Sequence, residues 1–341
     1  MESGDVPKRS EDILKLLTDI KEGRAPATAK PFDLKGVSLA HRDLRGLDLS
    51  GVDLSEADLS GSDLSGAKLF KANLKNATLM NAKLKGAELS GADLTDANLE
   101  DIDAEQVGLG MACLKGAHLF QANLEGSTLS MADFKGADLR SANLRNSRIR
   151  EAKLLNADFT SADLRNTDMA LSNVTGATFN NTDMREARLR LVTGYEKASW
   201  IGVDIRNVNF AGAYGLRRFA HDQNFIKEFR SSSRLASLIY YLWWITSDCG
   251  RSMVRWCLWI VILAFFFGWM YTFVEIDYGD HPTGISPVYF SVVTLTSLGY
   301  GDVTPASLSG QVVAMIEVIT GYIMLGGLLS IFSNKIARRA D

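Results

Sequence analysis

A five-residue repeat is the feature of this sequence that most constrains its fold. From Leu34 to Leu189, 31 of the 32 positions spaced five apart hold Leu, Ile, Val, Met or Phe, and the exception is Ala104. Two residues earlier most repeats have a small residue, as at Ala57, and Asp or Asn often stands between the two. A period of five fits neither the 3.6 residues of an α-helix nor the two of a flat strand, so the chain must turn a corner in every repeat.

Four such corners would close a square coil of 20 residues, with the large and the small residue pointing inward and the other three outward. Coils stacked at about 4.8 Å would give eight turns and a rod about 40 Å long. The pattern resembles that of the pentapeptide-repeat family, and units such as ADLSG, ANLKN and GADLT carry the resemblance. It implies a right-handed quadrilateral β-helix, which we place at residues 31–215.

Both ends of such a rod need a cover. Residues 1–30 are expected to form a helical cap, because Ser10 precedes two acids, apolar residues follow at helical spacing, and Gly23 ends the pattern. The repeat breaks after Leu189 and resumes one residue out of phase at Ile205 and Phe210. We therefore expect residues 190–202 to form a loop that bulges from the rod.

The charge pattern bears on what the rod binds. The formal net charge is -3, and the acidic residues 33–63 are balanced by a basic stretch from Arg140 to Lys153. No nucleic acid partner is expected, and the balance argues against the DNA mimicry known for some members of the family. A spacer, an oligomerisation module or a docking site for an unknown cytoplasmic ligand or protein is favoured. Three scattered cysteines exclude a disulfide framework and a CxxC zinc site.

The last third of the chain is apolar. Residues Trp256 to Val274 contain no charge, and a second apolar segment from Ser307 to Ser333 is interrupted only by Glu317. Both are long enough to cross a bilayer. Residues 217–255 contain seven Lys or Arg, whereas 275–286 contain acids and no base. This asymmetry predicts that both termini are cytoplasmic.

Residues 216–250 are expected to form an interfacial helix in contact with membrane lipid, since the segment is basic and rich in Tyr and Trp. The stretch from Phe219 to Thr246 would either act as a slide helix that couples the rod to the membrane domain or serve only as an anchor.

A short segment between the two spans is the most informative part. Ser286 and Pro287 are typical of a helix start, and about three turns follow before Gly299 and Gly301. A helix of this length cannot cross a membrane and must be re-entrant, which is tolerated where it is buried in protein or lines a pathway. Glycines allow the backbone angles that place successive carbonyls along one line, and rings of carbonyls are what potassium selectivity uses.

This segment resembles the pore of the potassium-channel family. The filter motif TVGYGD of the family corresponds here to Ser297, Leu298, Gly299, Tyr300, Gly301 and Asp302. Ser297 keeps the hydroxyl of the usual Thr, and Leu298 contributes only its carbonyl. The resemblance implies that the carbonyls of Ser297, Leu298, Gly299 and Tyr300 hold K+. It also implies a bacterial two-span pore domain at residues 251–341, with spans at about 252–274 and 307–335, a pore helix at about 287–297 and the filter at 297–302.

Other pore residues follow from the same resemblance. The residues expected to support the filter are Tyr289, Phe290, Thr296 and Glu317. Glu317 is expected to form a hydrogen bond with the pore helix, the alternative being a cation site that faces the pore. Gly321 is the candidate gating hinge, unless it serves close helix packing. The candidates for a hydrophobic inner gate, which would otherwise face lipid or the helix bundle, are Leu329, Ile331 and Phe332.

The sequence thus predicts a potassium channel with a cytoplasmic repeat domain of regulatory or scaffolding role. One chain supplies one filter strand, so a homotetramer is expected. The protein would conduct K+ passively, would not be an enzyme and would need no cofactor. No segment has Arg at every third position, so no voltage sensor is expected. Repeats of this kind suggest a bacterial inner membrane. The alternative function is a membrane-tethered scaffold whose rod recruits a partner, and a third hypothesis, which the charge balance disfavours, is inhibition of a topoisomerase through DNA mimicry.

Overall fold

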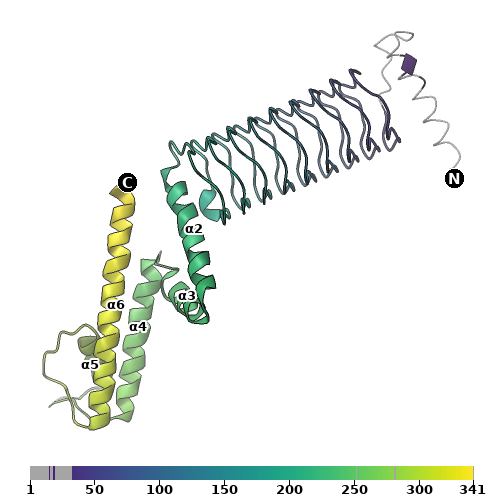
Figure 1. Ribbon diagram of the computed structural model, residues 1–341. Helices are drawn as coiled ribbons and strands as arrows, with labels where there is room; N and C mark the ends of the chain where they lie inside the picture. The colour runs from purple at the N-terminus through teal and green to yellow at the C-terminus, as the bar shows by residue number, and fades with distance from the viewer. Residues whose placement is uncertain (1–14, 16–17, 20–32, 251, 280–281, 341) are drawn as a thin grey trace, which may run out of the picture. The chain divides into compact units, whose positions relative to one another are not determined.

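The computed structural model describes residues 15, 18–19, 33–250, 252–279 and 282–340 (Figure 1). The chain divides into two compact units, Met1–Lys227 and Glu228–Asp341, and each is described by itself. The expected N-terminal helical cap lies almost entirely outside the described residues.

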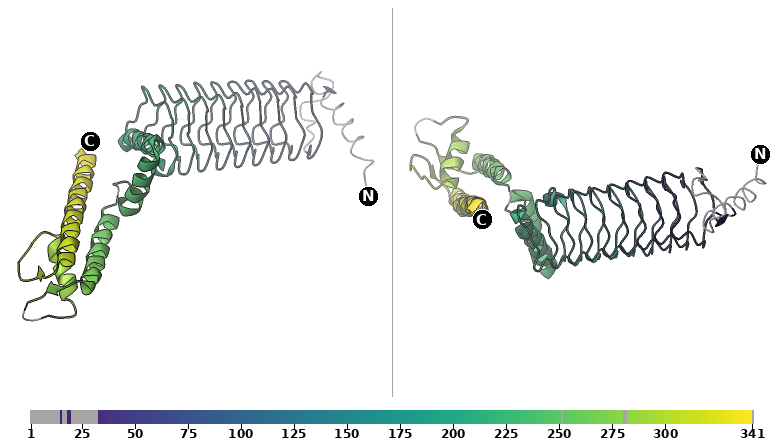
Figure 2. Two further views of the ribbon diagram at one scale, coloured as in Figure 1. Left: turned by 60° about the horizontal axis from the view of Figure 1, so that its bottom comes forward. Right: turned by 90° about the horizontal axis from the view of Figure 1, so that it is seen from above.

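The first unit is a four-sided parallel β-helix. From Asp33, which pairs with Asp53, to Asn173, which pairs with Thr193, each bridging residue pairs in parallel with the residue 20 positions later. The backbone N–H of Leu34 donates to the carbonyl of Asp53 at 2.7 Å, and the same bond recurs from coil to coil. Figures 1 and 2 show the coils stacked one upon another. The predicted β-helix is confirmed.

The core of the β-helix is a set of stacked columns. Side chains at the reference positions are almost fully buried, and the rings of Phe159, Phe179 and Trp200 stack with centroids 5.2 and 4.5 Å apart. Ala104, the exception to the repeat, stands two residues after Ile102, and both are buried. Large and small residues have therefore changed places in this repeat, which keeps the interior filled.

Each corner contains a residue with a left-handed backbone. It stands two positions after the reference residue, and its φ is +65° at Gly36, +56° at Asn76 and +65° at Leu171. Gly and Asn adopt this conformation readily, whereas other residues pay about 1–2 kcal/mol. A typical repeat thus contains a small and a large residue that point inward, followed by a left-handed residue that turns the chain. This order explains why a five-residue unit makes one side of a square.

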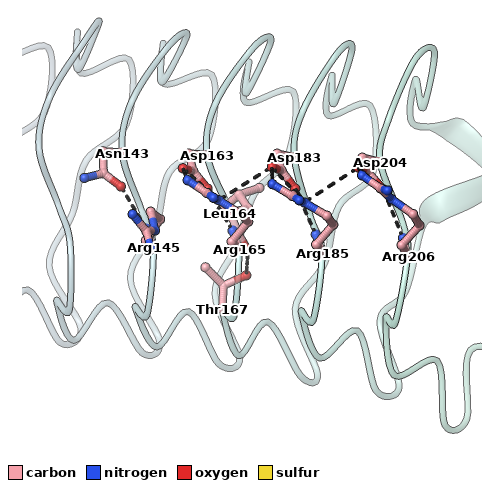
Figure 3. Close-up of polar contacts among 10 residues, drawn as sticks. All are labelled: Asn143, Arg145, Asp163, Leu164, Arg165, Thr167, Asp183, Arg185, Asp204 and Arg206. Atoms are coloured by element: carbon pink, nitrogen blue, oxygen red, sulfur yellow. Dashed lines mark hydrogen bonds and ion pairs between the residues drawn. The ribbon is translucent and has the colours of Figure 1, made fainter.

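A ladder of Asp and Arg side chains follows one outer face of the rod (Figure 3). Arg165 donates to Asp163 and lies 3.5 Å from Asp183 of the next coil. Arg185 repeats this arrangement with Asp183, and its Nε lies 3.7 Å from Asp204. The hydrogen bond from Arg185 holds the pKa of Asp183 below its ordinary value. Each exposed pair contributes little to stability, so the ladder mainly orients these side chains.

The rod continues through the segment where a bulging loop is expected. Thr193 still pairs with Asn173, and the spacing changes from 20 to 21 residues only at Ser199, which pairs with Thr178. The short 3-10 helix η1 (Tyr195–Lys197) takes up the single extra residue. The expected loop over 190–202 is therefore wrong in extent, because one inserted residue needs only a local change in one corner.

Helix α2 (Tyr214–Ser232) covers part of the end of the rod. The side chain of Gln223 accepts from the N–H of Trp200 at 2.7 Å and donates to the carbonyl of Ala198 at 3.0 Å. Asn224 accepts from the N–H of Gly202 at 2.6 Å. These bonds replace those of a further coil. The expectation of one interfacial helix over 216–250 is wrong, because the first half of this segment is a cap that buries Leu216 and Ala220.

The second unit contains the remaining elements. Helix α3 (Arg234–Ser247) begins at the N-cap Ser233, whose side chain accepts from the N–H of Ala236. Helix α4 (Met253–Met270) runs into the 3-10 helix η2 (Tyr271–Phe273), and the strand β1 (Ile276–Asp277) follows. Next come helix α5 (Ser286–Leu295), strand β2 (Thr304–Pro305) and the long helix α6 (Leu308–Ala340). In both figures α4 and α6 lie side by side (Figures 1 and 2).

Two helical segments in this unit are long and apolar enough to cross a membrane, Met253–Phe273 and Leu308–Ser333. Most of their large side chains, such as Phe265 and Ile319, are exposed in the single chain. Helix α3 is also apolar over much of its surface, with Leu238 and Trp244 exposed. Exposed apolar area of this extent is typical of membrane or subunit contacts.

Candidate functional site

The segment between the two long helices is held at its base by a short clamp. β1 and β2 pair antiparallel, Ile276 with Pro305 and Asp277 with Thr304. The N–H of Ala306 also donates to the carbonyl of Glu275. The clamp joins the end of the α4 region to the start of α6, so α5 and the residues after it form a closed excursion between the two helices.

Residues 297–302 leave the C-terminal end of α5 in an unusual backbone conformation. The φ angles of Ser297, Gly299 and Gly301 are +56°, +52° and +78°, and those of the residues between them are negative. Such alternation directs successive carbonyls to one side of the chain, unlike the alternating carbonyls of a β-strand. Residues 296–302 are all exposed in the single chain.

Polar bonds tie this segment to α5. The hydroxyl of Tyr289 donates to Asp302 at 2.7 Å, so the middle of α5 is linked to the residue that follows the glycines. At the other end, the N–H of Leu298 donates to the carbonyl of Val293. The hydroxyl of Thr296 donates to the carbonyl of Val292 at 2.6 Å. The segment is thus fixed to the helix at both of its ends.

A buried acid joins three parts of this unit. Glu317 of α6 is fully buried and accepts hydrogen bonds from two hydroxyls, Tyr271 of η2 at 2.5 Å and Ser291 of α5. The ring of Tyr271 also packs on Phe290 with centroids 4.7 Å apart. A buried carboxyl needs such partners, and these two hold the first long helix, α5 and α6 together at the depth of the short helix.

Glycines mark the closest approaches between helices. A Cβ at Gly321 would lie 2.1 Å from the carbonyl oxygen of Leu295, the last residue of α5. A Cβ at Gly268 of α4 would lie 3.0 Å from the backbone of Val288. Gly326, in contrast, has nothing within 4 Å of that position. In this structure Gly321 therefore serves close packing behind the glycine segment, and its role as a hinge stays a prediction.

The three candidate gate residues differ in their surroundings. Ile331 is only 6% exposed, whereas Leu329 and Phe332 are 61% and 49% exposed. A side chain that is already packed inside its own chain is unable to line a central pathway. This burial favours the helix bundle as the place of Ile331, while the other two face outward from the chain, and the gate stays a prediction.

Sequence reasoning did not identify Tyr271 and Ser291 as part of this site. Each is a hydroxyl in an apolar stretch, and the acid that pairs them lies 46 and 26 residues away. The indole of Trp256, which donates to the carbonyl of Met324 at 2.7 Å, was missed for the same reason. A polar group within an apolar stretch is the signal that the sequence offers for these three residues.

Fold and site together define a β-helical repeat rod joined to a two-helix membrane domain with a glycine-containing segment between the helices. Two family models match the chain. Pentapeptide repeats, in 8 copies, match residues 33–69, 62–101, 117–154 and 152–190. The ion-channel family matches residues 256–338. Neither family is one of enzymes. The chain therefore combines pentapeptide repeats with an ion-channel domain that is similar to those of potassium channels.

Curated relatives match over short stretches. The calcium-gated potassium channel TvoK of Thermoplasma volcanium is 34% identical over 70 residues, 19% of this chain and 20% of the relative. The voltage-gated potassium channel regulatory subunit KCNG1 of Homo sapiens is 34% identical over 83 residues, 24% of this chain and 15% of the relative. Two-pore potassium channel 1 of Arabidopsis thaliana is 32% identical over 57 residues, 17% and 16% of the two chains. The chain thus spans a fifth or less of these relatives.

Solved structures similar to this chain include the pentapeptide-repeat protein HetL. HetL from the cyanobacterium Nostoc, described as involved in heterocyst differentiation regulation, is 26% identical, with a TM-score of 0.34 over 58% of this chain and 92% of that one. QnrB1, a plasmid-mediated fluoroquinolone resistance protein, is 18% identical, with a TM-score of 0.40 over 53% and 98% of the two chains.

Proposed function

We propose that the protein is a potassium-selective channel built from four copies of this chain, with residues 297–302 as the selectivity filter. The observation that carries the proposal is the backbone of this segment, whose φ angles alternate in sign through Ser297, Gly299 and Gly301 between two apolar helices. Its match to the ion-channel family and its exposure in the single chain support the same proposal.

Four chains around one axis would bring four such segments together. The carbonyls of Ser297, Leu298, Gly299 and Tyr300 would then replace the hydration shell of K+. The C-terminal end of α5 points its partial negative charge at the start of the segment, which favours a cation there. The bond from Tyr289 to Asp302 would hold the outer end of the filter in place.

Residues behind the filter would keep its width constant. Glu317 accepts from Ser291 of α5 and from Tyr271, so the short helix is unable to rotate without breaking a buried hydrogen bond. We assign Phe290 to the same support, because it packs on Tyr271. Gly321 of α6 lies in close contact with Leu295, the last residue of α5. Because Thr296 comes next, α6 would support the start of the filter from behind.

At the other end of α6, Leu329 and Phe332 are our candidates for the gate. Both are large, apolar and exposed, so four copies around the axis would form a constriction that closes by excluding water. The hinge that opens it would lie at Gly321 or at Gly326, whose surroundings leave the helix free to bend.

We assign the rod to the cytoplasm, together with both termini of the chain, because residues 217–255, between the repeats and the first span in the sequence, contain seven Lys or Arg, whereas 275–286 contain none. Its role would be regulatory or scaffolding, through a ligand or protein partner. A bacterial inner membrane is the proposed location.

The test is ion flux from liposomes that contain the full-length protein. We expect K+ flux that exceeds Na+ flux and is blocked by barium. Gly299→Ala should abolish selectivity, because residue 299 has a φ of +52°, which alanine adopts only with strain. An added Cβ would touch no neighbour in the chain, so the effect would come from the backbone of the filter alone. Gly284→Ala in the same excursion is the matched control, because Gly284 has open space and no positive φ.

Equal K+ and Na+ flux in the unaltered protein would contradict the proposed filter. Absence of flux in every ionic condition, including after removal of the rod, would favour the alternative of a membrane-tethered scaffold.

A further inference from the structure

The end of the β-helix next to α2 contains a cavity of about 610 Å³. It lies wholly within the first unit, between the last coil and the first two turns of α2. Cavities of this size are typical of small-molecule sites. The proposed channel function makes no use of it.

The floor of the cavity is an uncovered part of the rod's core. Val203, Ile205, Val208 and Phe210 occupy the inward positions of the last coil, and all four are only partly buried. The corresponding residues one coil earlier are at most 1% exposed, for example Met184 and Leu189 at 0%. The helix cap accounts for the difference, because its hydrogen bonds from Gln223 and Asn224 cover only the side near Trp200.

The wall of the cavity is polar and carries both signs of charge, since Asp204 lines it beside Arg206, Arg217 and His221. Arg217 and His221 stand one turn apart on α2 and both are exposed. Arg206 stands at the rim, but its guanidinium is occupied by Asp204 at 2.9 Å. Asp204 is paired with Arg206, and among the described residues Arg217 forms no ion pair with a carboxylate. This side of the cavity therefore offers a cation that is free to bind an anion.

We propose that the cavity binds a single-chain amphiphilic anion, an alkyl carboxylate or alkyl phosphate, with its head on Arg217 and its chain on the apolar floor. An aliphatic chain fits better than a planar ring, because three of the four floor residues are branched aliphatics and Phe210 offers one aromatic face only. Burial of the chain would cover the only open part of the rod's core at this end that the structure describes.

The experiment uses the full-length protein in phosphatidylcholine nanodiscs, with octanoate and octyl phosphate as probes and isothermal titration calorimetry as the measurement. Empty nanodiscs correct for partition into lipid. We expect saturable binding that strengthens about tenfold from hexanoate to octanoate, since two more methylenes are buried. Preference between the two octyl probes identifies the head group, and either preference supports the proposal.

Variants locate the site. Arg217→Ala should weaken binding about tenfold or more, which is the loss of one charge-assisted hydrogen bond. Arg218→Ala is the matched control, because Arg218 is the next residue on α2 and does not line the cavity, and it should bind within twofold of the unaltered protein. Val208→Phe should occupy part of the apolar floor where the chain is expected to lie and weaken binding, with circular dichroism to confirm that the rod is folded.

Several results would overturn the proposal. They are octanoate heats equal to those of empty nanodiscs, equal affinity in Arg217→Ala, octanol binding as tightly as octanoate, and adenosine monophosphate binding more tightly than either octyl probe. The measurement needs no ion flux, so its outcome does not depend on whether the pore conducts.

Discussion

Replacing Gly321 by alanine would place a methyl group 2.1 Å from the carbonyl oxygen of Leu295. Because Cβ contacts shorter than 3.0 Å are essentially never seen, α6 and the end of α5 would have to separate by about 0.9 Å at this point. The displaced atom belongs to the backbone that leads into the filter segment, so no side-chain rotation relieves the contact.

The energy of this change follows from two opposing effects. In a helix, alanine is more favourable than glycine by about 1 kcal/mol, whereas overpacking of a rigid contact costs about 1–3 kcal/mol. The upper end applies here because the clash is with backbone, so we expect a net loss of about 2 kcal/mol. Gly326→Ala is the matched control on the same helix, since open space surrounds Gly326 and only the favourable helix effect remains.

Thermal unfolding of the full-length protein in detergent, followed by tryptophan fluorescence, measures this difference. Five of the six tryptophans lie after residue 228, so the signal reports mainly on the membrane unit. Gly321→Ala should unfold roughly 5 °C or more below the unaltered protein, and Gly326→Ala at the same temperature or above. If Gly321→Ala were as stable as Gly326→Ala, the packing argument would be refuted and a pure hinge role favoured.

Three further predictions concern stability. Ile102→Ala should lower the free energy of unfolding by about 2–4 kcal/mol, because it leaves a cavity. Adding Ala104→Leu should restore most of this stability in melts followed by circular dichroism. If it restores nothing, large and small residues have not simply changed places. Glu317→Ala should destabilise the membrane unit by about 2 kcal/mol, because two buried hydroxyls lose their acceptor. Glu317→Gln keeps an acceptor and should lose less stability. Equal losses of stability in the two variants would contradict this account. The pKa of Asp183 is lowered in the fold, so its stabilisation is present above about pH 4 and lost as the pH falls further. Asp183→Asn should therefore flatten the decline in melting temperature below pH 4, and an unchanged slope would argue against the ladder.

The rod was predictable because its information is local. The pattern within each repeat predicts which side chains point inward, and the register of the whole rod follows from repeating the unit. The sequence shows Ala104 as an exception to this pattern, whereas its exchange with Ile102 was found from the burial of both residues. The cap was not predictable, because Gln223 and Asn224 look like ordinary polar residues of a helix until the end of the last coil is placed beside them.

In the candidate site, too, the parts encoded by a contiguous stretch were predictable, and those that depend on tertiary packing were not. The motif from Ser297 to Asp302 is contiguous, and its flanking spans are recognisable from composition alone. The partners of Glu317 and the contact of Gly321 depend on how three helices pack, and no periodicity in the sequence encodes that distance. Ile331 was placed among the gate candidates for this reason, since only packing shows that it faces its own chain.

The uniform step of the rod has a consequence for how such a protein changes over evolutionary time. In the described part of the chain, the coils inside the rod bond to no coil other than the one before and the one after, and nearly every coil repeats at the same spacing of 20 residues. An in-frame duplication or loss of one coil's worth of codons, wherever its ends fall, leaves both neighbours with an equivalent partner. The length of the rod is thus free to drift by whole coils while the cap and the membrane domain stay unaltered.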